Sequence, residues 1–362
     1  MESIFDYMQK YDYENLFLCQ DRALGLKAVI AIHDTTLGPA TGGCRMWQYN
    51  NEMEAIEDAL RLARGMTYKY AAAGVNLGGG KAVIIGDPKR KDRESIFRAL
   101  GKFINRLGGK YITGEDVGTT LRDMEYIRME TDHVVTLPTY LGGAGDIAPM
   151  TAFGVIRAME ACCKRVYGSE KIERKKVAVQ GIGAVGRNMV EQLKEHGAQI
   201  IVTDLDLEKI DAIVAKYGVE KVEPEAIYDL ECDIFCPCAL GAIINDTTVE
   251  RLKCRIICGS ANNQLKDEKL HGKLLENKGM LYAPDFIANA GGTIYDTDRI
   301  GIGGVSHERG KEKVSRIYQN MELVFEIADR EKIPSYLAAE RMAEERIRKI
   351  AEVKKYVDDL NF

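Results

Sequence analysis

This chain of 362 residues lacks both long apolar runs and strongly basic tracts. No hydrophobic stretch approaches the roughly 18 residues that a membrane-spanning helix requires, and the segment from Met1 to Asp6 is acidic, unlike a targeting signal. The net charge is −5 and no arginine-rich segment is present, so the sequence has no electrostatic footprint for nucleic acid. We therefore expect a cytoplasmic protein that binds neither a membrane nor a nucleic acid.

The cysteines and histidines of the chain show neither the pattern of a disulfide framework nor the spacing of a metal site. The nine cysteines are odd in number and scattered, which argues against a disulfide framework. One cluster matches no familiar zinc spacing and falls mainly in expected buried strands, where cysteine behaves as a small hydrophobe. This cluster comprises Cys232, Cys236, Cys238, Cys254 and Cys258. Since the five histidines are also isolated from one another, we expect no metal site.

The second half of the chain predicts a doubly wound α/β sheet. A composition of 46% hydrophobic and 29% charged residues is typical of a globular protein of about two domains. From Lys176 onward, short apolar runs alternate with helical stretches, and this alternation predicts parallel strands joined by crossover helices. The expected strands are 177–180, 199–203, 234–237, 255–258 and 280–283, and the first helices are expected at 185–196 and 207–216.

The first half is predicted to be a separate α/β domain. Its strands are expected at 26–33 and 82–85, and its helices at 52–73 and 93–107. A glycine-rich stretch at 142–146 marks the seam between the two halves. We therefore predict an N-terminal α/β domain at 1–148, a Rossmann-type domain at 149–335, and a charged amphipathic helix at 336–362 that packs back on the first domain.

Lys69 and Lys81 are unusual because the segment between them is almost free of charge. A lysine that loses solvation can act as a base near neutral pH, so the pair is a candidate for chemistry. There are ordinary alternatives. The aliphatic part of Lys69 could lie on a helix face with its ammonium group in water, and Lys81 could simply be the first residue of a strand. Three glycines precede Lys81 and favour a close approach of backbone to a ligand. A phosphate loop is excluded, because Val75 and Ala82 stand where that motif needs glycine and a hydroxyl.

Residues 181–186 match the G-x-G-x-x-G fingerprint directly after an expected strand and at the start of an expected helix. Such glycines allow a tight turn and close approach of a pyrophosphate, which the helix N-terminal amides then face. Asp204 ends the next expected strand, where a carboxylate accepts hydrogen bonds from a ribose and repels the 2′-phosphate of NADP. The alternative is a glycine turn in some other α/β protein. We predict NAD binding by Gly181, Gly183, Ala184, Val185, Gly186 and Asp204.

Nearly from end to end, the chain resembles the amino acid dehydrogenases related to glutamate dehydrogenase, and most of all the leucine dehydrogenases, with phenylalanine dehydrogenases also similar. The matching stretches are 36–40, 42–46, 60–69, 77–88, 115–120, 259–265, 282–285, 289–292 and 341–346. The resemblance implies reversible, NAD-dependent oxidative deamination of an L-amino acid, branched-chain or otherwise apolar, to a 2-oxo acid and ammonium. It also implies a homo-oligomer assembled through the first domain, which would bind the substrate.

At matching positions, the resemblance implies that Lys69 binds the substrate carboxylate and that Lys81 is the general base that activates water. Asp116 would handle the proton of the amino group, since a positioned carboxylate can act as an acid or base. On sequence alone, Asp116 could instead cap a helix near Thr119. The other implied site residues are Gly42, Gly43 and Asn263 at the substrate carboxylate, and Thr151, Asn262 and Asn289 at the nicotinamide.

Four positions depart from the small apolar residues that line the side-chain pocket of leucine dehydrogenases: Thr41, Gly114, Thr293 and Asp296. An unpaired carboxylate against a leucine side chain is unfavourable, so a larger or amine-bearing substrate, as in a phenylalanine dehydrogenase, is an alternative. Asp296 could also cap the following helix or pair with Arg299.

Two non-enzymatic alternatives stay open at this point. A catalytically silent NAD-binding regulatory protein could share the fold, because fold alone does not give activity. A metal-binding regulator built on the cysteine cluster is the other. The presence of Lys69, Lys81 and Asp116 together favours an enzyme, because a sensor needs none of them.

Overall fold

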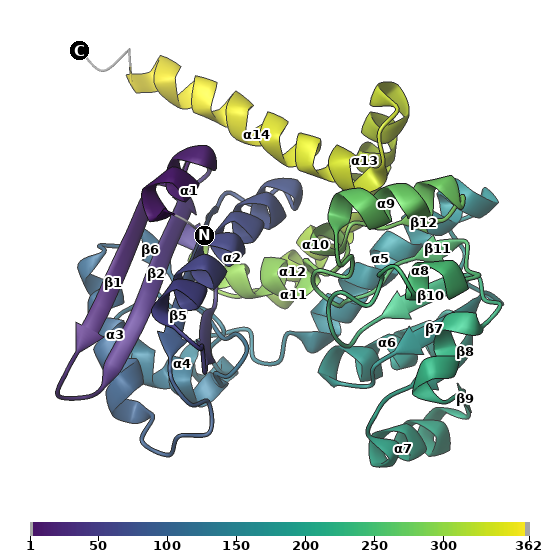
Figure 1. Ribbon diagram of the computed structural model, residues 1–362, viewed down its shortest axis with the longest axis horizontal. Coiled ribbons are helices and arrows are strands. Elements are labelled where there is room, and N and C mark those ends of the chain that lie inside the picture. Colours follow the sequence, from purple (N-terminus) through teal and green to yellow (C-terminus); the bar gives the residue numbers. More distant parts are fainter. Residues whose placement is uncertain (1–2, 359–362) are drawn as a thin grey trace. The chain divides into compact units, whose positions relative to one another are not determined.

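A computed structural model of the chain describes residues 3–358. Two compact α/β units account for these residues (Figure 1). The first unit contains the residues up to Gly145, the segment Asp296–Ser306 and the residues from Ala343 onward, and the second contains Asp146–Tyr295 and His307–Met342. The domain bounds expected from the sequence differ from this division at 146–148, 296–306 and 336–342, and they remain a prediction.

The first unit is built on a six-stranded sheet in the order β1-β2-β5-β3-β6, with β4 also paired to β5. β1 is antiparallel to β2, β2 is antiparallel to β5, and the remaining pairs are parallel. This sheet contains both strands expected from the sequence. Its strands are β1 (Asn15–Asp21), β2 (Leu26–Asp34), β3 (Ala40–Thr41), β4 (Cys44–Trp47), β5 (Gly78–Ile85) and β6 (Tyr111–Ile112).

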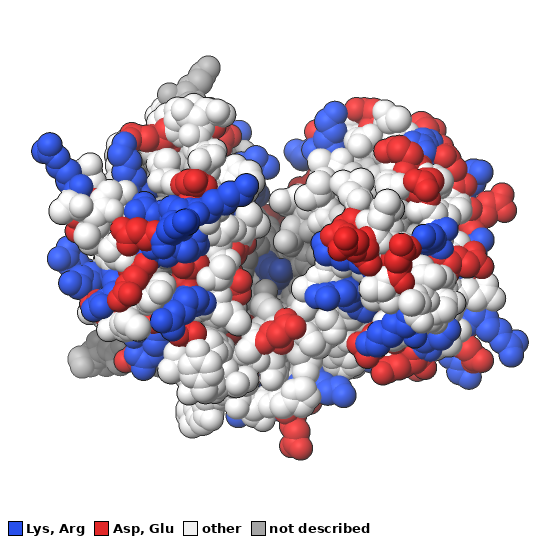
Figure 2. All heavy atoms as spheres, turned by 90° about the horizontal axis from the view of Figure 1, so that it is seen from below, with Lys and Arg blue, Asp and Glu red and all other residues white. Residues whose placement is uncertain are grey.

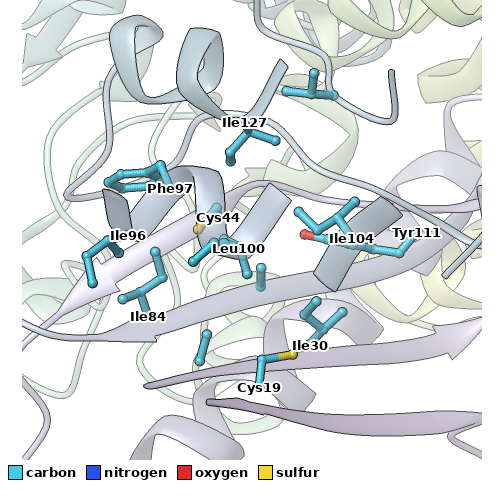
Figure 3. Packing of buried hydrophobic residues seen from close by; sticks show 14 of the residues in the cluster. Cys19, Ile30, Cys44, Ile84, Ile96, Phe97, Leu100, Ile104, Tyr111 and Ile127 are labelled. Atoms are coloured by element: carbon cyan, nitrogen blue, oxygen red, sulfur yellow. The ribbon is translucent and has the colours of Figure 1, made fainter. Parts of the chain in front are cut away.

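Helices cover both faces of this sheet, because successive side chains of β2 point to opposite sides. Val29 and Ala31 pack with residues of α2 (Glu52–Ala72), whereas Ile30 and Ile32 pack with residues of α3 (Glu94–Arg106). Figure 3 shows part of the second cluster, in which side chains of α3 lie beside those of β2 and β5. Both expected helices are confirmed to within a residue at each end. The other helical segments of this unit are α1 (Ile4–Lys10), α4 (Leu121–Arg128), η1 (Thr139–Leu141) and η3 (Thr297–Ile300).

The glycines before Lys81 belong to β5 and serve packing within the protein, contrary to our interpretation of them as a place for a ligand. A Cβ on Gly78 would lie 2.0 Å from the carbonyl oxygen of Asp34, and one on Gly79 would lie 2.1 Å from Oγ1 of Thr67. A Cβ on Gly80 would lie 2.7 Å from the ring of Tyr111. The glycines therefore let α2 and the neighbouring strands approach β5 closely.

The second unit has a fully parallel six-stranded sheet in the order β12-β11-β10-β7-β8-β9. This order, which reverses beside β7, is that of a doubly wound Rossmann domain, so the predicted fold class is confirmed. All five expected strands are present, with β11 and β12 shorter than expected. The strands are β7 (Lys176–Gln180), β8 (Gln199–Thr203), β9 (Glu220–Lys221), β10 (Ile234–Pro237), β11 (Ile256–Ile257) and β12 (Leu281–Tyr282).

Helices of the second unit confirm the two crossover helices expected after β7 and β8, now α6 and α7. They are α5 (Ala148–Tyr167), α6 (Ala184–Glu195), α7 (Leu207–Tyr217), η2 (Pro224–Asp229), α8 (Thr248–Arg251), α9 (Glu268–Asn277), α10 (Asp285–Ala288), α12 (His307–Ser315) and α13 (Ile317–Glu331). Two further helices, α11 (Gly291–Asp296) and α14 (Ser335–Asp358), contribute residues to both units.

The distal part of α14 packs within the first unit, against the loop that follows α2. Arg346 donates hydrogen bonds to the carbonyl oxygen of Val75 at 2.9 Å and to Oδ1 of Asn76 at 2.5 Å. Tyr68 of α2 donates to Glu344 at 3.2 Å. These contacts stabilise the loop between Lys69 and Lys81.

Charged side chains of both signs are mixed over the face of each unit in Figure 2, in keeping with the small net charge of the chain. Across residues 3–358, no helix combines the length and the apolar character that crossing a bilayer would require.

Candidate active site

Lys81 lies in the middle of β5, opposite Ala31 of β2, and its side chain is only 5% exposed. Its Nζ lies 3.1 Å from Oδ2 of Asp116, whose side chain is 23% exposed. A buried ammonium group is stable only when it is paired. The structure therefore brings together the two residues for which sequence analysis predicted catalytic roles.

The carboxylate of Asp116 is held by a second cation, because Nε of Arg45 lies 2.9 Å from the same Oδ2 atom. Burial alone would raise the pKa of Asp116, but the charges of Lys81 and Arg45 outweigh it and hold this pKa below its ordinary value. The capping alternative for Asp116 is wrong. The N-cap of α4 is Thr120, which forms a capping box with Asp123.

Two charged residues next to this pair were missed in the sequence analysis. Nη1 of Arg45 lies 3.0 Å from Oδ2 of Asp58, and the hydroxyl of Tyr49 donates to the same oxygen at 2.6 Å. Arg45 stands two residues after Gly43, within the stretch 42–46 that carries the family resemblance, and this was a usable signal. Asp58 is one of several acidic residues on α2 and carries no signal of its own.

The residues of the first unit predicted to bind the substrate carboxylate lie in α2 and between β3 and β4. Lys69 is half-buried in the last turn of α2. Gly42 is buried; its N–H donates to the carbonyl oxygen of Ile112 and its own carbonyl oxygen accepts from the hydroxyl of Tyr111 at 2.6 Å. A Cβ on Gly43 would lie 2.9 Å from Cβ of Asp116. Gly43 thus allows the segment that carries Asp116 to approach, and the substrate role of both glycines stays a prediction.

Three predicted pocket positions lie in the first unit, and two of them meet at Thr136. Asp296 is 4% exposed and accepts hydrogen bonds from the N–H and the hydroxyl of Thr136. A Cβ on Gly114 would lie 2.7 Å from Oγ1 of the same threonine. Thr41 is buried in β3, where its hydroxyl donates to the carbonyl oxygen of Pro39 at 3.3 Å.

Neither alternative that we gave for Asp296 describes its contacts. Asp296 precedes η3 but makes no side-chain capping bond there, and Arg299 donates to the carbonyl oxygen of Val134 at 2.6 Å. Burial raises the pKa of Asp296 to about 6, although the hydrogen bonds from Thr136 and the charge of Arg299 act to lower it. The sequence did not predict the contact between Asp296 and Thr136, because the two residues lie 160 positions apart.

In the second unit, the glycine fingerprint forms the turn between β7 and α6. Gly181 has a φ of 98°, in the left-handed region that favours glycine, and a Cβ on Gly186 would lie 2.0 Å from the carbonyl oxygen of Gly181. Gly183 is the N-cap of α6, which continues with Ala184 and Val185, and open space surrounds its Cβ position. The turn therefore has room for a phosphate at a helix N-terminus.

Asp204 follows β8 and faces this turn. Its carboxylate accepts hydrogen bonds from the N–H of Ile182 at 2.5 Å and from the N–H of Asp206 at 2.9 Å. The charge of Asp204 is therefore fixed beside the glycine fingerprint, as a dinucleotide site requires.

The predicted nicotinamide residues gather at the carboxyl edge of the same sheet. Nδ2 of Asn289 donates to Oδ1 of Asn262 at 2.7 Å and to the carbonyl oxygen of Ser260 at 3.2 Å. A Cβ on Gly292 would lie 2.2 Å from Oγ1 of Thr151, so Thr151 lies against the turn after Asn289.

The two remaining predicted residues also belong to the second unit. Asn263 adopts a φ of 51°, next to Asn262, and Thr293 is half-buried in α11. Because Asn263 and Lys69 lie in different units, the predicted cooperation between them stays a prediction.

The cysteine cluster has no metal-binding geometry. Among residues 3–358, no group of three or more His, Cys, Asp or Glu side chains is arranged to hold a metal ion. All nine cysteines are free, and the closest contact in the cluster joins Sγ of Cys236 and Sγ of Cys238 at 3.5 Å.

Comparison with known proteins agrees with this geometry. Residues 18–133 match the family model described as Glu/Leu/Phe/Val dehydrogenase, dimerisation domain, and residues 142–206 and 202–352 match that of Glutamate/Leucine/Phenylalanine/Valine dehydrogenase. Leucine dehydrogenase of Thermoactinomyces intermedius is 59% identical over 344 residues, 95% of this chain and 93% of that protein. Phenylalanine dehydrogenase of Bacillus thermotolerans is 46% identical over 353 residues, 96% of this chain and 92% of that protein.

A solved structure is similar over nearly the whole chain. The crystal structure of L-tryptophan dehydrogenase from Nostoc punctiforme matches with a TM-score of 0.85 and 42% identity, and the match covers 96% of this chain and 100% of that one. Homology of this extent implies a nicotinamide cofactor. The chain therefore belongs to the Glu/Leu/Phe/Val dehydrogenase family, as a leucine dehydrogenase-like amino acid dehydrogenase.

Proposed function

We propose that the protein catalyses reversible, NAD-dependent oxidative deamination of an L-amino acid. The amino acid, NAD⁺ and water give a 2-oxo acid, ammonium, NADH and a proton. The observation that carries this proposal is the buried contact of 3.1 Å between Nζ of Lys81 and Oδ2 of Asp116. A base and a carboxylate in hydrogen-bond reach of each other are what deprotonation of an amine and activation of water require.

The residues of the first unit divide the proton chemistry between them. Lys69 neutralises the substrate carboxylate, and Asp116 takes a proton from the amino group. The bound nicotinamide would accept the hydride from the α-carbon. Lys81, once it has given up its own proton, takes a proton from the water that attacks the iminium carbon. Asp116 then returns its proton to the nitrogen, and ammonium leaves as the C–N bond breaks. The contact of 3.1 Å lets a proton pass between Lys81 and Asp116.

NAD rather than NADP is the cofactor that we propose. The carboxylate of Asp204 is held by the N–H groups of Ile182 and Asp206, so it presents a fixed negative charge beside the glycine turn. This charge suits a ribose hydroxyl and opposes a 2′-phosphate. Room at the N-terminus of α6, around Gly183, supports binding of the pyrophosphate.

A branched-chain or other apolar amino acid is the proposed substrate, as in the leucine dehydrogenases that are similar to this chain. Thr136 donates hydrogen bonds to both carboxylate oxygens of Asp296. Asp296 is therefore not an unpaired charge, and an apolar substrate side chain nearby is less unfavourable than it would be beside one. We also propose that the protein works as a homo-oligomer, because residues 18–133 match a dimerisation domain. The cytoplasm is its proposed location, as expected from the sequence.

The test is the rate of NADH formation with a panel of L-amino acids that includes Leu, Ile, Val, Phe, Trp and Glu. Lys81→Ala should lose most of this activity while still binding NADH, whereas Lys102→Ala, at an exposed position of α3, should behave as the parent. If none of the amino acids supports NADH formation, a catalytically silent regulatory protein would be the better explanation. An active Lys81→Ala variant would remove the proposed base.

A further inference from the structure

Arg45 joins two carboxylates that lie on different segments of the first unit. Its Nε contacts Oδ2 of Asp116 at 2.9 Å, and its Nη1 contacts both oxygens of Asp58, at 3.0 and 3.3 Å. The side chains of all three residues are about three-quarters buried, with exposed fractions of 23% to 25%. A planar guanidinium with a fork of donors can make such a bridge, whereas the point charge of a lysine cannot hold both partners in one geometry.

The backbone around Arg45 is tied to both halves of the catalytic pair. β4, which carries Arg45, runs parallel to β5, and Cys44 pairs with Ala82, the residue after Lys81. On its other side, Cys44 donates to the carbonyl oxygen of Gly114 at 2.7 Å and Met46 donates to that of Val117 at 3.0 Å. Arg45 is therefore fixed between the strand of Lys81 and the segment of Asp116.

Both cations contact the same oxygen of Asp116. Nε of Arg45 and Nζ of Lys81 lie 2.9 Å and 3.1 Å from Oδ2, whereas no side chain or backbone group among residues 3–358 donates a hydrogen bond to Oδ1. Two donors on one oxygen fix the rotation of the carboxylate and leave the other oxygen as its available acceptor. An amino group that loses a proton to this carboxylate would meet Oδ1.

We propose that Arg45, anchored by Asp58, is a positioning residue that fixes the Asp116 carboxylate through Oδ2 and leaves Oδ1 for the amino group of the substrate. This inference rests on the proposed function. Arg45 touches neither reacting atom; it acts on the reaction through Asp116.

Electrostatics support this arrangement. The charged and titratable groups that face Asp116 are Lys81 on β5, Arg45 and Cys44 on β4 and, behind Arg45, Asp58 on α2 with the hydroxyl of Tyr49. Burial raises the pKa of the Cys44 thiol, so it stays neutral and leaves the two cations as the partners of the carboxylate. Asp58 in turn balances the charge of Arg45, which keeps the guanidinium in place without neutralising Lys81.

The test compares kcat and KM for the amino acid in Arg45→Ala, Arg45→Lys and Asp58→Asn. Misplacement of a catalytic group by about 1 Å can cost about 100-fold in rate, so we expect kcat of Arg45→Ala to fall by about that factor while KM changes little. Guanidinium at millimolar concentration should restore part of kcat in Arg45→Ala, and Arg45→Lys should retain an intermediate kcat. Asp58→Asn should lower kcat by a smaller factor, because it loosens Arg45 without removing it.

Arg98 offers a matched control, since it also bridges two carboxylates of the first unit, Glu94 and Glu130. Arg98→Ala should keep the parent kcat and gain nothing from guanidinium. The inference is overturned if Arg45→Ala keeps the parent kcat. It is also overturned if the fall in kcat comes with a fall in Tm, guanidinium does not restore kcat, and Arg45→Lys is as impaired as Arg45→Ala.

Asp116→Asn, measured in parallel, separates this inference from the proposed function. An Asp116→Asn variant as active as the parent would refute the proposed role of Asp116 itself. An inactive Asp116→Asn beside a fully active Arg45→Ala would refute only the positioning role of Arg45.

Discussion

Asp296 accepts two hydrogen bonds from Thr136, one from its N–H at 2.8 Å and one from its hydroxyl at 2.5 Å, across 160 residues of sequence. Thr136 has a φ of 55°, in the left-handed region that a β-branched residue rarely adopts. The carboxylate therefore stabilises a strained turn in the first unit. Thr136 also lies beside the Cβ position of Gly114, so this turn adjoins a second position of the predicted substrate pocket.

The first prediction concerns the stability of Asp296→Asn as a function of pH. Burial raises the pKa of Asp296 to about 6, so the folded state binds this proton more tightly than the unfolded state does. The contribution of Asp296 to the free energy of unfolding is thus largest below about pH 4 and falls by up to about 3 kcal/mol as the pH rises through 6. Asp296→Asn should lack this fall, as measured by urea unfolding between pH 4 and 8.

Asp211→Asn is a suitable control for that series, because Asp211 is exposed and pairs with Lys221 on the surface. Its stability should follow the parent at every pH. Parallel pH profiles for Asp296→Asn and the parent would show that folding does not change the pKa of Asp296, contrary to the prediction.

A second prediction concerns Asp296→Val and substrate choice. If Asp296 lines the pocket, valine should raise kcat/KM for leucine, isoleucine and valine, because an apolar surface replaces a buried carboxylate. The same change leaves the N–H and hydroxyl of Thr136 without their acceptor, so we also expect a loss of stability of about 1–3 kcal/mol. Steady-state rates and thermal unfolding measure the two effects separately. No gain in kcat/KM for branched-chain substrates would refute the pocket role and leave the structural one.

The third prediction is that Gly114→Ala is destabilising. The added methyl group would lie 2.7 Å from Oγ1 of Thr136 and 3.0 Å from a methyl of Val135, so either the threonine or the backbone must move. Overpacking of this kind typically costs about 1–3 kcal/mol. The control is Gly65→Ala on α2, where open space surrounds the new Cβ and the better helix propensity of alanine should add about 0.5–1 kcal/mol. Equal stabilities of the two variants would contradict the close packing at Gly114.

The fourth prediction concerns cofactor choice through Asp204. Asp204→Asn keeps an acceptor for the N–H of Ile182 but removes the charge that opposes a 2′-phosphate. The ratio of kcat/KM for NAD to that for NADP should fall by about tenfold, which corresponds to about 1.4 kcal/mol. Rates with the two cofactors under equal conditions give this ratio. An unchanged ratio would mean that Asp204 only supports the glycine turn.

Most strands of the second unit were predictable because they are short, mainly apolar runs that are buried in the sheet. β8 and β10 have the bounds that the sequence predicts, 199–203 and 234–237. The two-residue strand β9, Glu220–Lys221, was not predictable, because it is exposed and has no apolar pattern. The glycine fingerprint was recognisable for a similar local reason, since its turn depends on residues that are adjacent in the chain.

The glycines at 78–80 show where local patterns mislead. Their lack of side chains indicated a close approach, but the sequence could not say what approaches. In the structure, the neighbours are Asp34, Thr67 and Tyr111, which come from three different segments.

The sequence by itself determined the fold class, the glycine turn after β7 and Lys81 as a candidate base, because each of these follows from local periodicity, turn chemistry or the setting of one residue. Asp116 became a candidate only through the resemblance to a family. Only the tertiary structure decided how the charges are arranged. The pairing of β4 with β5 brings Arg45 to Asp116 and Lys81, and the fold carries Asp296 to Thr136. Contacts of this kind join residues far apart in the chain, and burial then makes their pairing energetically necessary.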